Sequence, residues 1–157
     1  MFIRPKNAKG VTYYAIVESY RDPGPLKAPR QRTMVSLGRH PTALAAFTAE
    51  EKNLERLEQR RQVLDGSGRQ ADADALDRAI TKSIRKRNKI EPFAMAEVIK
   101  RAAAPEMDGM TPIQVAGKIG TTVQVADWAV SVRGWPDLVA AVVNRMMPLK
   151  AAAMRGR

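Results

Sequence analysis

Two strand-like runs separated by a turn-rich gap occupy residues 11–40, and they constrain the fold more than any other part of the chain. β-Branched and aromatic residues dominate Val11 to Tyr20, as is typical of strands. A second run of the same character, Arg30 to Leu37, follows a gap whose three prolines cannot continue a sheet ladder. The two runs therefore predict one antiparallel hairpin.

A third strand is expected before this hairpin. Phe2 to Pro5 has strand character, and residues 6–10 supply the asparagine and glycine that tight turns favour. The N-terminal 40 residues are therefore predicted to form a three-stranded antiparallel sheet.

Alternation along the second run predicts two faces for that strand. One face would hold Gln31, Thr33, Val35 and Leu37, and the other Arg30, Arg32, Met34 and Ser36. We expect the apolar face to pack and the arginine face to meet solvent. A two-stranded ribbon fits the DNA major groove, and arginine can hold a guanine edge or a phosphate. A basic face is equally typical of any solvated sheet.

These residues also carry a family resemblance. The order Lys-x-x-x-Gly-x-x-Tyr-Tyr-x-x-Val-Glu-Ser-Tyr-Arg at Lys6–Arg21, then Arg-Gln-Arg-Thr-x-x-x-Leu-Gly-Arg-His at Arg30–His40, resembles the N-terminal leader of certain insertion-sequence transposases. In that family the leader precedes a long catalytic domain with metal-binding acidic residues, which implies that the leader handles DNA. The resemblance implies DNA contacts at Lys6, Lys9, Arg21, Arg30, Arg32 and Arg39. No catalytic transposase domain is expected here, because the remaining 117 residues (157 minus 40) have helical patterns.

The distribution of charge favours a polyanionic partner. The net charge is +11, and residues 1–40 hold eight Lys and Arg against two acids, an excess of +6. Phosphate neutralisation by such residues releases counterions, so nucleic acid is the expected partner. In this hypothesis the sheet presents Arg30, Arg32 and Tyr14 to a DNA groove. Lys6, Lys9, Arg21, Lys27 and Arg39 would contact the flanking phosphates.

Residues 41–90 predict a charged antiparallel helical hairpin. A helix is expected to begin near Thr42 or Thr48, the pattern breaks at residues 65–68, and a second helix is expected from about Gln70 to Asn88. The second helix ends in a basic run from Lys82 to Lys89. Arg85, Lys86, Arg87 and Lys89 are predicted to extend the phosphate contacts, although cations also suit a helix C-terminus. A homodimer through the hairpin is a further hypothesis.

Glu91-Pro92 is expected to separate the hairpin from a C-terminal helical region, residues 91–157. There the order from Thr111 to Trp128 resembles a helix-turn-helix, with a turn at Gly120. If its second helix contacts bases, Thr121, Thr122 and Gln124 are the candidates. That helix carries no Lys or Arg up to residue 132, which favours a structural helical module instead.

Several kinds of chemistry have no visible residues in the sequence. The chain has no cysteine and a single histidine, His40, and it lacks a glycine-rich phosphate loop. We therefore expect neither catalysis, nor a metal, nor any cofactor. Without an apolar membrane segment or a secretory signal, a cytoplasmic protein is expected, nucleoid-associated if the source is bacterial.

Taken together, the sequence predicts an α+β protein with three parts: a basic β-sheet module at 1–40, a charged helical hairpin at 41–90 and a small helical bundle with a helix-turn-helix-like segment at 91–157. The predicted function is non-catalytic DNA binding in a protein related to transposons or other mobile elements. Two alternatives stay open. One is a structural or oligomerisation adaptor built on the hairpin, and the other is an RNA-binding protein whose tyrosines stack on unpaired bases.

Overall fold

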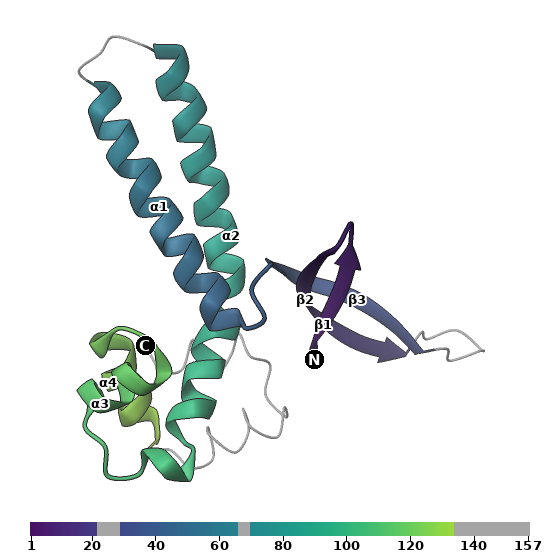
Figure 1. Cartoon of the computed structure of the whole chain (residues 1–157), viewed down its shortest axis with the longest axis vertical. Coiled ribbons are helices and arrows are strands. Elements are labelled where there is room, and N and C mark those ends of the chain that lie inside the picture. Colours follow the sequence, from purple (N-terminus) through teal and green to yellow (C-terminus); the bar gives the residue numbers. More distant parts are fainter. Residues whose placement is uncertain (22–28, 66–69, 134–157) are drawn as a thin grey trace.

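A computed structural model describes residues 1–21, 29–65 and 70–133, and it confirms the α+β architecture (Figure 1). The elements in chain order are β1 (Phe2–Ala8), β2 (Val11–Arg21), β3 (Pro29–Gly38), α1 (Ala43–Asp65), α2 (Gln70–Ala102), the 3-10 turn η1 (Pro105–Met107), α3 (Pro112–Ile119) and α4 (Val123–Arg133). The sheet projects sideways from the base of the α1–α2 hairpin, and the small helices lie below that base. No helix in these described ranges is long and apolar enough to cross a membrane.

The sheet is antiparallel with the order β1-β2-β3. Lys9 and Gly10 both have positive φ, which gives the β1–β2 turn the twist that hairpins favour. β1 pairs with β2 only as far as Val17, whereas β2 continues to Arg21 paired with β3. Beyond Val17 the sheet is therefore a ribbon of two strands, residues 18–21 and 29–32, which we call the two-stranded ribbon.

A register shift in β3 overturns the simple alternation expected for that strand. Ile16 pairs with Val35 but Val17 pairs with Thr33, so Met34 is an extra residue of the bulge type. Directly opposite residues share a face, and Arg32 lies opposite Glu18. Arg32 is consequently on the same face of the sheet as Val35, and the prediction that they occupy opposite faces is wrong.

The long helices pack along each other as the predicted antiparallel hairpin, but α2 does not end where expected. It runs through Pro92 to Ala102 as one helix. A proline inside a helix loses one backbone hydrogen bond and costs about 3 kcal/mol. Burial of Ile90, Ala94 and Val98, each with no exposed surface, offsets this cost. The boundary predicted at residue 91 therefore falls inside a continuous helix.

Two apolar clusters hold the parts together, and α2 contributes to both. The first joins the sheet to the base of the hairpin through Ile16, Leu37, Phe47 and Ile90. Leu37 and Ile90 are essentially inaccessible to solvent. This cluster fixes the sheet against the helices and so determines which surface of α2 the sheet meets.

The second cluster holds the helix-turn-helix-like segment on the end of α2. Val98 packs there with buried residues of α3 and α4. Thr111 begins α3 with a capping box shared with Gln114, and Gly120 ends it in the left-handed conformation at φ 77°. The predicted helix start and turn are both confirmed.

Candidate nucleic-acid interface

The two-stranded ribbon gathers arginine, tyrosine and glutamate on one face. Tyr20 lies opposite Arg30, and Glu18 lies opposite Arg32. The Arg32 guanidinium donates to Glu18, with Nε 2.8 Å from Oε2, and it lies 5.9 Å from the centre of the Tyr20 ring. The Arg32 side chain is still 62% exposed. A guanidinium has five N–H donors, so donors are left for a further acceptor.

A groove of about 780 Å³ separates β3 from the middle of α2. One wall is Thr33–Ser36 of β3. The opposite wall carries five exposed cations of α2, which we call the basic face: Arg78, Lys82, Arg85, Lys86 and Lys89. Their spacing of three, four or one residues places them on one side of a helix. Asp77 also lines the groove, but it pairs with Arg61 of α1 at 2.8 Å.

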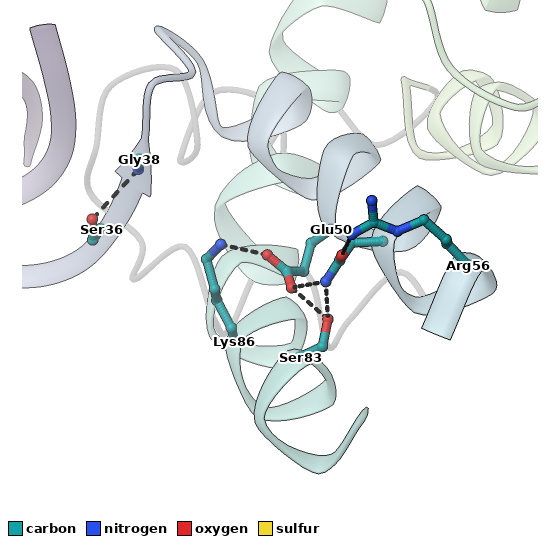
Figure 2. Close-up of polar contacts among 7 residues, drawn as sticks. Ser36, Gly38, Glu50, Arg56, Ser83 and Lys86 are labelled. Carbon is teal, nitrogen blue, oxygen red and sulfur yellow. Dashed lines mark hydrogen bonds and ion pairs between the residues drawn. The ribbon is translucent and has the colours of Figure 1, made fainter. Parts of the chain in front are cut away.

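Lys86 differs from the rest of the basic face because α1 neutralises it. Its ammonium bonds to one oxygen of buried Glu50, whose other oxygen accepts from the Ser83 hydroxyl (Figure 2). Asn53 donates to both Glu50 and Ser83, at 3.4 and 3.2 Å. Burial raises the pKa of Glu50, but the hydrogen bonds from Lys86, Ser83 and Asn53 together with the charge of Lys86 outweigh burial and lower the pKa below its ordinary value. Glu50 is thus ionised and holds Lys86.

The other predicted contacts on the sheet lie at different places. Exposed positions are found for Lys6 on β1, Lys9 in the β1–β2 turn, Arg21 at the end of β2 and Arg39 just after β3. Tyr14 is half-buried and packs against the first apolar cluster, opposite Gly38 and away from the ribbon. The structure therefore brings Arg30 and Arg32 together without Tyr14. Lys27 lies outside the described residues.

Arg87 does not belong to the groove. It is half-buried, its Nε is buried without a partner among the described residues, and its terminal nitrogen donates to the Asn88 side chain at 3.2 Å. Its charge acts on Glu51 of α1 instead. Burial raises the pKa of Glu51 above its ordinary value, and the Arg87 charge opposes that rise.

The helix-turn-helix candidates line a pocket at the base of the hairpin, and Thr122 and Gln124 are also exposed to solvent. Thr121, Thr122 and Gln124 border a space of about 420 Å³ together with residues of α1, α2 and Trp128. The Thr122 hydroxyl also accepts from the Val125 N–H at 3.3 Å, so it caps α4. In this arrangement the three residues border the hairpin.

Two cations of the groove, Arg78 and Lys82, are not among the contacts that the sequence predicts. Lys82 belongs to the basic run, and Arg78 lies outside it. A signal was available in the sequence, because Arg78, Lys82, Arg85 and Lys89 follow one another by four, three and four residues. The sequence does not show which face of α2 packs against the sheet.

Comparison with known proteins assigns the sheet and most of the hairpin to one family domain. Residues 3–89 match the family model described as the N-terminal domain of IS1634 family transposases. Those 87 residues are more than half of the 157 in the chain, and the chain belongs to this family. The predicted resemblance to insertion-sequence transposases is therefore confirmed, and it extends over the hairpin. The protein is related to mobile elements.

No curated protein and no solved structure matches the chain. Within residues 1–21, 29–65 and 70–133, no group of three or more His, Cys, Asp or Glu side chains could hold a metal ion.

Proposed function

We propose that the chain is a DNA-binding part of a transposase-family protein and that the two-stranded ribbon enters the major groove of duplex DNA. The observation that carries the proposal is the ribbon itself, which continues beyond β1 with Arg30 and Arg32 on one exposed face. Membership of a transposase family supports DNA as the polyanion.

The dimensions of B-DNA suit this ribbon. The major groove is about 12 Å wide and admits a two-stranded β-ribbon. Arg32 is held by Glu18 on one side of its guanidinium, so the side chain is already oriented before it meets DNA. A preoriented guanidinium loses less conformational entropy on binding than a free one. In this proposal Arg30 and Arg32 contact guanine edges.

Phosphate contacts would then fix the position of the ribbon. Lys6, Lys9, Arg21 and Arg39 are exposed around the sheet, and Lys27 lies in the sequence between β2 and β3. Contacts of this kind set orientation and affinity but carry no sequence information. The proposed role of this chain is binding, with no catalytic step assigned to its residues.

The test is a mobility-shift titration of the full chain with duplex DNA at several salt concentrations. We expect binding that weakens steeply with salt, and we expect Arg30→Gln combined with Arg32→Gln to remove sequence discrimination of about 1 to 3 kcal/mol per lost base contact. Lys100→Gln combined with Lys118→Gln, at two exposed positions outside the ribbon and the groove, is the matched control.

Absence of duplex binding even at low salt would overturn the proposal. Stronger competition by single-stranded RNA than by duplex DNA would favour the RNA-binding alternative. A stable oligomer in sedimentation that shows no response to DNA would favour the adaptor alternative.

A further inference from the structure

The groove between β3 and α2 is a second charged surface, distinct from the face of the ribbon. We infer that this groove binds the phosphate backbone of one strand of duplex DNA, and that Arg78, Lys82, Arg85 and Lys89 are the residues that hold it. The inference rests on the proposed DNA binding and deepens it, because it assigns backbone contact to the groove and base contact to the ribbon.

The four cations are available for an external anion. Among the described residues, their side chains make no hydrogen bond or ion pair. Their charges therefore lack the compensation that Glu50 gives Lys86. Like charges gathered on one helix face repel one another, and bound phosphates would relieve that repulsion.

The spacing of the cations fits a DNA strand. From Arg78 to Lys89 the helix rises eleven residues, or about 16 Å at 1.5 Å per residue. Successive phosphates of one strand are about 3.4 Å apart along the duplex axis and farther apart along the winding strand, so the basic face spans at most about five nucleotides. Among the described residues that line the groove, Asp77 is the single acid, and its pairing with Arg61 leaves the cationic character in place.

The opposite wall is suited to a phosphate strand as well. Thr33 and Ser36, which carry hydroxyl groups, line the groove, and β3 is an edge strand of the sheet. Within the described ranges no strand pairs with the outer edge of β3. Backbone N–H groups and hydroxyl side chains are common phosphate donors in DNA complexes.

Salt dependence separates this surface from the ribbon. The test variant of the full chain changes Arg78, Lys82, Arg85 and Lys89 to glutamine. The slope of log affinity against log salt is negative, and we expect its magnitude to decrease by about 3.6, or 0.9 for each of four phosphate contacts. The loss of affinity should be the same on every DNA sequence. The matched control removes the same charge from exposed positions outside the groove: Lys52, Arg60, Lys100 and Lys118, each changed to glutamine.

Single substitutions keep the test decisive if the fourfold variant folds poorly. Each single change to glutamine at Arg78, Lys82, Arg85 or Lys89 should decrease the magnitude of the slope by about one. Lys86→Gln should leave the slope unchanged. If the native chain binds DNA but the groove variants keep the slope of the control, the groove inference is overturned and the proposed function stands. If the native chain binds no duplex DNA, both fail.

Discussion

At the scale of single residues, the pairing of Glu18 with Arg32 sets the charge of the ribbon. A carboxylate beside the arginine repels phosphate even while it orients the guanidinium. Glu18→Gln should therefore strengthen binding to all DNA by a few-fold and weaken the distinction between sequences, because Arg32 loses its anchor. The measurement is the affinity for several duplexes at one salt concentration. Weaker binding to every duplex would contradict this role for Glu18.

The Glu50–Lys86 pair stabilises the helical hairpin. Lys86→Ala removes a charged hydrogen-bond partner from a buried carboxylate, and we expect a loss of about 1 to 3 kcal/mol in the free energy of unfolding. Glu50 has a pKa below its ordinary value of 4.5, so its stabilising effect is present above about pH 4.5 and is lost as pH falls.

The destabilisation caused by Lys86→Ala should accordingly be largest near neutral pH and shrink on acidification below about pH 4.5. Denaturant unfolding at pH 7 and pH 3.5 measures both values, with Lys82→Ala as the control because that side chain has no partner among the described residues. An equal loss at the two pH values would show that Glu50 does not act through its charge.

At the scale of elements, the pairing of β3 with β2 around the bulge at Met34 decides where the arginines lie. Deletion of Met34 should remove this register shift and leave Arg30 and Arg32 on their present face, because Thr33 and Arg32 already pair with Val17 and Glu18. We therefore expect this deletion to keep the sequence discrimination that the double arginine variant loses, with the helical circular dichroism retained. Met34→Ala, which keeps the extra residue, is the control. Loss of discrimination by the deletion variant but not by Met34→Ala would contradict the assigned pairing.

The sequence predicted the elements better than their junctions. The two strands of the second hairpin and the Thr111 cap are local signals that appear where the sequence predicts them. The turn predicted at residues 6–10 is shorter, because β1 extends to Ala8 and leaves only Lys9 and Gly10 in the turn. The extra residue in β3 leaves no local mark, because a bulge is a relation between two strands. The continuation of α2 past Pro92 depends likewise on burial against the sheet and the small helices, which no single segment encodes.

At the scale of the whole molecule, the first apolar cluster joins the two charged surfaces. Leu37 is 1% exposed and links the end of β3 to the base of the hairpin. The basic run of α2 could be seen in the sequence, but its division between groove and hairpin could not. That division follows from the side of α2 that meets β3, which puts Arg85 in the groove and Arg87 against α1.

The central claim is that the two-stranded ribbon lies in the major groove of duplex DNA. Methylation of guanine N7 by dimethyl sulfate reports directly on that groove, since N7 is an acceptor on its floor. We predict that the bound native chain protects specific guanines and that protection disappears with Arg30→Gln and Arg32→Gln while duplex binding at low salt persists. Unchanged N7 reactivity on DNA saturated with the native chain would contradict the account.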